Sequence, residues 1–173
     1  MKCANNPHAQ RVVTVVLFAI YGLLLTGLIL FKFPFSYQVI GSGRVLNLIP
    51  FAGSFTKQGS LRLSEIVENV ALFVPFGVYL SMVRRQWSWG YRILAIVCTT
   101  VAFESIQYAF AIGRADITDV LGNTLGGVMG IALYAALTRI LGPRTDRAIT
   151  IGALVLTLCA MAFWLVLLAR TWS

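Results

Sequence analysis

Charged residues are scarce in this chain. Only 12% of its 173 residues are charged, and 58% are hydrophobic, whereas an average soluble domain carries about 25% charged residues. The mean hydropathy is correspondingly high, at +0.82. This composition excludes an ordinary water-soluble domain. It predicts one all-α domain over residues 1–173, a polytopic bundle of transmembrane helices whose main partner is the lipid bilayer.

Histidine and cysteine are also rare. His8 is the only histidine, and Cys3, Cys98 and Cys159 are the only cysteines. Because His8 precedes the first long apolar run, a Ser–His–Asp or Cys–His centre cannot form inside the bundle. The cysteines are odd in number and far apart, which fits neither a disulfide framework nor a zinc site. The sequence therefore leaves enzymatic activity open but does not favour it.

The chain also lacks a concentrated basic stripe, although its formal net charge is +8. The arginines and lysines stand at the ends of apolar runs, so we expect no nucleic-acid partner. In a membrane protein such placement indicates topology.

Five apolar runs are long enough to cross a hydrocarbon core, which takes about 20 helical residues. The predicted spans are residues 12–31, 65–83, 93–112, 117–141 and 149–168. Between the first two, residues 45–51 are too apolar for a solvated loop and too short to span. They predict an interfacial or re-entrant segment.

The basic residues predict how these spans are oriented. With the N-terminus in the cytoplasm, the inner segments hold eight lysines and arginines in 30 residues, and the outer segments hold six in 45. Cytoplasmic segments are typically the more basic, which favours this orientation. Residues 45–51 and the turn at 113–119 then share the outer face.

Five of the six acidic residues fall in or near that outer layer. Glu104 is predicted about 12 Å below the outer face, at 1.5 Å per helical residue. Ionisable groups at such depth are costly and typically mark functional sites. The candidate ligand-binding residues are Asn47, Glu65, Asn69, Glu104, Gln107, Arg114, Asp116, Asp119 and Asn123.

Several of these residues have alternative structural interpretations. Asp116 is a plausible N-cap of the helix at 117–141, with Asp119 at its third position. Arg114 is placed to neutralise Asp116 or Glu104, and Glu65 could be a solvated acid of a first helical turn. An all-oxygen site for a divalent cation could be built from Glu104, Asp116 and Asp119, and we expect no other cofactor.

Small residues and one proline predict how the helices pack. Gly122, Gly126 and Gly130 repeat at a spacing of four, which lets a second helix approach closely. Pro75 lies within the span at 65–83, where it should kink the helix and free a carbonyl near Ala71.

Three blocks of sequence resemble the VanZ-like family of small bacterial membrane proteins. The first is Asn47-Leu-Ile-Pro50-Phe51. The second is Glu65 and Asn69 followed by Leu72-Phe73-x-Pro75-x-Gly77. The third is Glu104-x-x-Gln107, then Gly113-Arg114-x-Asp116-x-x-Asp119-x-x-x-Asn123-x-x-Gly126, continuing to Gly130. Together the blocks cover residues 44–141.

The resemblance implies a multi-pass protein of the bacterial cell membrane, linked to low susceptibility to lipoglycopeptide antibiotics such as teicoplanin. It brings no catalytic roles with it. The leading hypothesis is an outward-facing acidic pocket that binds a lipid-linked cell-wall precursor or the lipidated antibiotic. The alternatives are an enzyme acting on a lipid phosphate or cell-wall precursor, and a proton- or cation-coupled transporter.

Overall fold

The computed structural model describes residues 7–31, 45–51, 63–112, 114–155 and 157–158. Within them the chain forms four long helices, as expected for an all-α fold. They are α1 (Pro7–Phe31), α2 (Leu63–Val83), α3 (Trp89–Phe110) and α4 (Ile117–Leu141). All four are long and apolar enough to cross a membrane.

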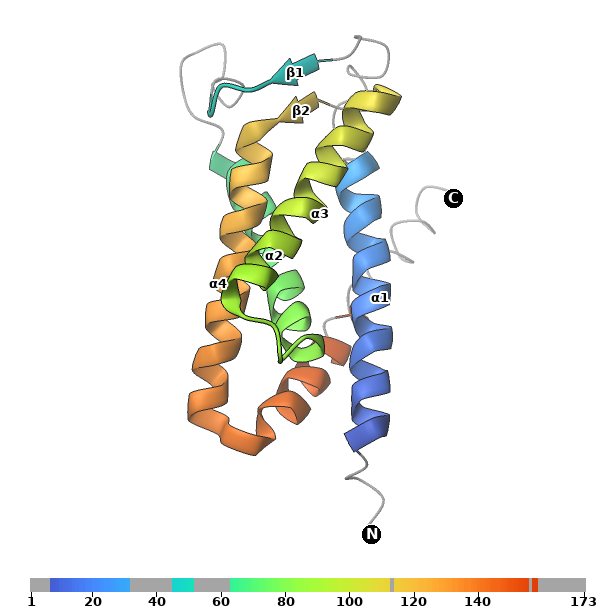
Figure 1. Cartoon of the computed structure of the whole chain (residues 1–173). Helices are drawn as coiled ribbons and strands as arrows, with labels where there is room; N and C mark the ends of the chain where they lie inside the picture. Colours follow the sequence, from blue (N-terminus) through green and yellow to red (C-terminus); the bar gives the residue numbers. More distant parts are fainter. Residues whose placement is uncertain (1–6, 32–44, 52–62, 113, 156, 159–173) are drawn as a thin grey trace, which may run out of the picture.

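Successive helices run in opposite directions along one bundle (Figure 1). The N-terminus of α1 lies at one end, and two short strands cover the other end. We call the end with the strands the acidic end, because Asp116 and Asp119 lie there. The opposite end, where α2 gives way to α3 and α4 ends, is called the basic end.

The fifth predicted span, residues 149–168, lies only partly within the described residues. After α4 the chain turns through the short 3₁₀ helix η2 (Gly142–Arg144), and residues 145–155 are helical. This helix packs against α1, where the hydroxyls of Thr14 and Thr150 lie 3.3 Å apart in a buried contact. A fifth crossing therefore stays a prediction.

Helix α3 begins four residues earlier than the apolar run indicates. Ser88 is its N-cap and accepts a hydrogen bond from the Tyr91 amide, so the helix starts at Trp89 instead of Ile93. Serine is a favoured N-cap because its hydroxyl satisfies a free amide of the first turn. The hydropathy pattern could not reveal this, because the first turn of α3 is polar and aromatic.

The main difference from the sequence-based expectation is a small parallel sheet. Strand β1 (Val45–Asn47) pairs with β2 (Arg114–Asp116), with Asn47 opposite Asp116. Parallel strands need a long crossover connection, which α2 and α3 provide here. Part of the segment predicted to be interfacial or re-entrant is thus an extended strand across the end of the bundle (Figure 1).

Helices α2 and α4 make the most extensive contact in the bundle, and glycines allow it. A Cβ atom on Gly126 would collide with the Val70 carbonyl, and one on Gly130 with the Val74 carbonyl. On the facing helix, a Cβ on Gly77 would collide with the carbonyl of Gly127. The two backbones therefore touch directly, which confirms the packing role expected for the glycine repeat.

The buried apolar core lies where α1, α2, α3 and α4 meet. Its fully buried members include Phe73, Ile96 and Ile131, one from each of the last three helices. Helix α1 joins this core, and the Tyr21 hydroxyl donates to the Leu72 carbonyl of α2. That acceptor lies beside the region where Pro75 interrupts the backbone hydrogen bonds of α2.

Replacing Gly126 with alanine should destabilise the bundle by about 1–3 kcal/mol, the usual cost of overpacking. Gly27→Ala in α1 is the matched control, because nothing lies within 4 Å of its added methyl group. We expect the control to be neutral or stabilising, since alanine favours a helix by about 0.5–1 kcal/mol over glycine. Thermal unfolding in detergent measures both, and equal midpoints would contradict the close crossing.

Candidate functional site

The acidic end is organised around Asp116, which ends β2 and caps α4. Its backbone is extended, and its Oδ1 atom accepts a 2.8 Å hydrogen bond from the Thr118 amide. Aspartate is a preferred N-cap because its carboxylate satisfies a free amide and interacts favourably with the helix dipole. The structural interpretation of Asp116 as an N-cap is therefore confirmed.

The same carboxylate also holds the neighbouring strand. Asp116 Oδ2 accepts a 2.8 Å hydrogen bond from Asn47 Nδ2, across the β1–β2 pair. Beyond β1 the chain turns, with the Ile49 amide donating to Asn47 Oδ1 at 3.2 Å and the Phe51 amide donating to Thr118 Oγ1 at 2.8 Å. Phe51 has a φ of 63°, a strained conformation for an aromatic residue. The bond to Thr118 helps to hold that turn against α4.

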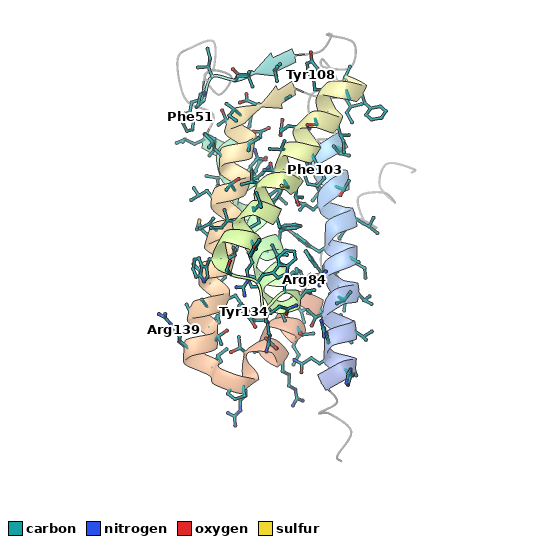
Figure 2. The ribbon with its side chains drawn as sticks, viewed as in Figure 1. Phe51, Arg84, Phe103, Tyr108, Tyr134 and Arg139 are labelled. Carbon is teal, nitrogen blue, oxygen red and sulfur yellow. The ribbon has the colours of Figure 1, made fainter. Side chains whose placement is uncertain are left out.

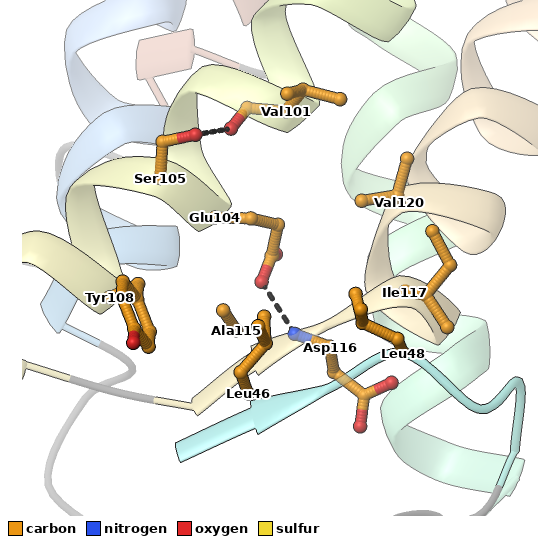
Figure 3. Close-up of a pocket in the computed structure, with 10 residues that line it drawn as sticks. All are labelled: Leu46, Leu48, Val101, Glu104, Ser105, Tyr108, Ala115, Asp116, Ile117 and Val120. Carbon is orange, nitrogen blue, oxygen red and sulfur yellow. Dashed lines mark hydrogen bonds between the residues drawn. The ribbon is translucent and has the colours of Figure 1, made fainter. Parts of the chain in front are cut away.

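Glu104 connects α3 to this assembly. Its side chain is 8% exposed, and Figure 3 shows it pointing from α3 toward β2. There Glu104 Oε2 accepts a 2.8 Å hydrogen bond from the Asp116 backbone amide. The Asp116 carboxylate points away from Glu104 (Figure 3). The two acids are therefore linked through an amide donor and do not face each other.

Two further pairs tie the helices together below the strands. Asn69 Nδ2 of α2 donates to Asp119 Oδ1 at the start of α4, at 2.7 Å. Asn123 Nδ2, about one turn further along α4, donates to Thr100 Oγ1 of α3 at 2.8 Å. These hydrogen bonds connect α2 to α4 and α3 to α4 inside an otherwise apolar bundle.

Gln107 links α3 to α1, since its Nε2 donates to the Ile29 carbonyl at 2.9 Å. Its Oε1 atom and the Oδ1 atom of Asn123 are both buried, and within the described part of the chain neither accepts a hydrogen bond. Buried polar atoms are normally bonded to protein or to ordered water.

A groove of about 340 Å³ opens between α3 and the strands. Glu104, Ser105 and Tyr108 line it from α3, while Ala115 and Ile117 line it from the opposite side (Figure 3). Leu46 and Leu48, in and just after β1, complete the wall. Most of the residues that line the groove are apolar, and its polar residues are Glu104, Ser105, Tyr108 and Asp116.

Of the nine sequence-predicted residues, only Glu104 and Asp116 are among the described residues that line this groove. Asn47, Asn69, Gln107, Asp119 and Asn123 form the surrounding hydrogen bonds. Glu65 lies on the exposed surface in the first turn of α2, as its structural interpretation expected. Arg114 contributes its backbone to β2, and its side chain lies outside the described residues.

The carboxylates proposed for a cation are not gathered into one cluster. Among the described residues, no three histidine, cysteine, aspartate or glutamate side chains are placed to hold a metal ion. Glu104 accepts a bond from an amide of β2, and Asp119 accepts one from Asn69. Each of these two carboxylates thus has a hydrogen-bond donor from a different element.

The sequence analysis missed several residues of the site. Thr118 holds the turn after β1, and Leu46 and Leu48 form an apolar wall. The two leucines are separated by one residue, the spacing at which side chains of a strand share a face. That spacing could have indicated an extended segment, but a run of three residues is too short to be distinctive.

A family model described as VanZ/LLP1 matches residues 18–139 of this chain. The chain belongs to the VanZ/LLP1 family. It is also similar to Protein VanZ of Enterococcus faecium, with 36% identity over 146 residues, which cover 82% of this chain and 87% of that protein. No solved structure matches the chain.

The three VanZ-like blocks converge at the acidic end. The first block forms β1 and its turn, the second lies in α2, and the third runs from α3 through β2 into α4. Asn47, Asn69, Glu104 and Asp116 all take part in hydrogen bonds between different elements. The family match and the long apolar helices together indicate a membrane protein, in which these residues build the acidic end of the fold.

Swapping the two residues of the Asn47–Asp116 hydrogen bond tests this assembly. Asn47→Asp should lower the free energy of unfolding by about 1.5–3 kcal/mol, because it sets one carboxylate against another and removes a hydrogen bond to a charged group. Adding Asp116→Asn should restore most of the loss, since asparagine is an equally good N-cap. Chemical unfolding of the two single variants and the double variant gives the coupling, and purely additive effects would contradict the pairing.

Proposed function

We propose that this VanZ-like protein acts at the bacterial cell envelope, where the groove at its acidic end binds a lipid-linked or lipidated ligand. Through this binding it would reduce susceptibility to lipoglycopeptide antibiotics such as teicoplanin. The observation that carries the proposal is the groove itself, in which apolar walls stand beside the buried carboxylate of Glu104. An amphipathic ligand fits such a mixed surface.

The dimensions of the groove favour recognition of one part of a ligand. Its volume of about 340 Å³ is at the lower end of the range of roughly 300–1,000 Å³ for small-molecule sites. A complete glycopeptide is larger than this, so the groove would take a hydrocarbon chain or a small polar group. Leu46 and Leu48 are both more than half exposed, which leaves the wall formed by β1 accessible to a ligand from outside the bundle.

The distribution of charge supports an outward-facing groove. Arg84 and Arg85 follow α2, and Arg92 lies in the first turn of α3. Arg139 lies in the last turn of α4, Arg144 in η2 and Arg147 in the helix that follows. Because cytoplasmic segments are enriched in arginine and lysine, the basic end would face the cytoplasm, together with the N-terminus. The acidic end and its groove would then lie at the outer face of a multi-pass protein.

In this proposal the polar residues have two roles. Asn47, Asn69, Asp116 and Asp119 position the strands and helix ends, since their side chains are bonded to one another in pairs. Glu104 both holds β2 and lines the groove, so it is the candidate for direct contact with the ligand. As an acceptor, it suits a ligand group that carries N–H or O–H donors.

Glu104→Gln tests the proposed function directly. Expression of the wild-type protein in a susceptible host should raise the inhibitory concentration of teicoplanin more than that of vancomycin, which has no acyl chain. Glutamine keeps the size of the side chain but removes its charge, and we expect most of the teicoplanin effect to be lost. An unchanged effect at equal protein level would exclude a role for Glu104 in binding.

Filling the groove with a larger apolar side chain tests whether the ligand binds there, and it changes no charge. Val101→Trp adds bulk to the groove wall, whereas Leu94→Trp introduces the same indole ring two turns earlier on the same helix. The two positions are 46% and 56% exposed, and Leu94 does not line the groove. Only Val101→Trp should abolish the teicoplanin effect, with both variants present at wild-type levels. Equal activity of the two variants would mean that the ligand binds elsewhere.

A further inference from the structure

The basic end carries a second concentration of charge that the groove does not explain. Its two connections, residues 84–92 and 139–147, contain six arginines and a single acid, Asp146. Five of the arginines are exposed, and Arg139 and Arg84 are labelled in Figure 2 near this end of the bundle. This end of the molecule therefore has a strong local excess of positive charge.

Asp146 joins the two connections into one surface. It forms an ion pair with Arg85, from the link between α2 and α3, and its Oδ1 accepts a 2.9 Å hydrogen bond from the Tyr134 hydroxyl of α4. The one acid of the basic end is thus already committed to structural contacts. It holds the segment after η2 beside the start of α3.

Arg92, the buried arginine of the basic end, holds the link between α2 and α3 in place. Arg92 is 9% exposed and donates from Nε to the Arg84 carbonyl and from Nη2 to the Arg85 carbonyl, at 3.3 and 2.8 Å. It therefore satisfies carbonyl groups at the end of α2 that the helix itself leaves free. The guanidinium of Arg84 lies 5.3 Å from the ring centre of Trp87, an aromatic residue of the kind that lies at the headgroup level of a bilayer.

The remaining three arginines, Arg139, Arg144 and Arg147, surround the turn at η2. All three are exposed, and within the described residues none of them forms an ion pair. The turn that carries them is closed by Thr145, whose hydroxyl is within hydrogen-bonding distance of the Leu137 and Gly142 carbonyls, at 3.1 and 2.7 Å. Three guanidinium groups are thus presented on a well-fixed turn.

We propose that Arg139, Arg144 and Arg147 form a binding site for the phosphate group of an anionic phospholipid. Guanidinium groups bind phosphate oxygens through paired, charge-assisted hydrogen bonds. Trp87 and the apolar residues at the end of α4 place the site at the edge of the hydrocarbon region, where lipid headgroups lie. The site is separate from the groove and does not depend on the proposed antibiotic phenotype.

The test uses the full-length protein in neutral detergent, titrated with short-chain phosphatidylglycerol, phosphatidylcholine or inorganic phosphate. Thermal stability reports binding, because a ligand that prefers the folded state raises the midpoint. We expect phosphatidylglycerol to stabilise the wild type at far lower concentrations than the other two. Each arginine replaced by glutamine should weaken the apparent affinity about fivefold, which corresponds to about 1 kcal/mol per basic residue near an anionic surface.

Arg11→Gln is the matched control for Arg144→Gln. It removes the same charge from an exposed arginine near the start of α1, which is also at the basic end but does not belong to the turn at η2. A larger loss of affinity for Arg144→Gln supports a defined site, whereas equal losses would show only a diffuse effect of net charge and overturn it. Stabilisation by inorganic phosphate at the same concentrations as the lipid would likewise overturn a lipid site, because the turn would then bind a free anion.

Discussion

The direct contact between the backbones of α2 and α4 is the constraint on which the acidic end depends. Glycines at the crossing remove the side chains that would hold the helices apart, and Asn69 can therefore reach Asp119 at the start of α4. That contact fixes the position of the first turn of α4, and with it β2, which directly precedes the helix. Strand β1 can pair only because β2 is held across the end of the bundle.

The polar residues of the acidic end form a connected hydrogen-bond network instead of a cluster of facing carboxylates. Glu104 accepts from the Asp116 amide, and the Asp116 carboxylate accepts from Thr118 and Asn47. Acids in an apolar protein are tolerated when donors surround them. This arrangement explains how several carboxylates can lie near one end of a hydrophobic bundle. It also leaves a groove whose polar side is formed by a residue that the fold itself holds in place.

The two ends of the bundle differ in chemistry, and each difference has a structural cause. At the acidic end the carboxylates accept hydrogen bonds from amide groups of strands and helix starts, where N–H groups are free. At the basic end Arg92 donates to the carbonyl groups that close α2, where free acceptors accumulate. The free backbone groups at the helix termini therefore account for part of the difference in charge between the two ends of the bundle. The exposed arginines around η2 go beyond that requirement, and this excess is the basis for inferring a phosphate-binding site there.

The sequence by itself determined the class of the protein, the approximate extent of its helices and most of the polar residues at the acidic end. Long apolar runs have a local physical meaning, so the approximate extents of α1, α2 and α4 could be predicted. The glycine repeat indicated that a helix packs closely against α4, but it did not identify α2 as that helix. Asp116 as an N-cap was also foreseen, because capping depends on a few neighbouring residues. The earlier start of α3 was missed, since its Ser88 cap precedes a turn with little hydropathy signal.

Only the tertiary structure decided how those residues combine. The β1–β2 pair joins segments almost 70 positions apart, and no local pattern records which three-residue stretches will meet. The division of the carboxylates among donors from different elements was hidden for the same reason. Contacts between distant segments depend on helix crossing and strand register, and these are properties of the packed chain that residue spacing along the sequence does not contain.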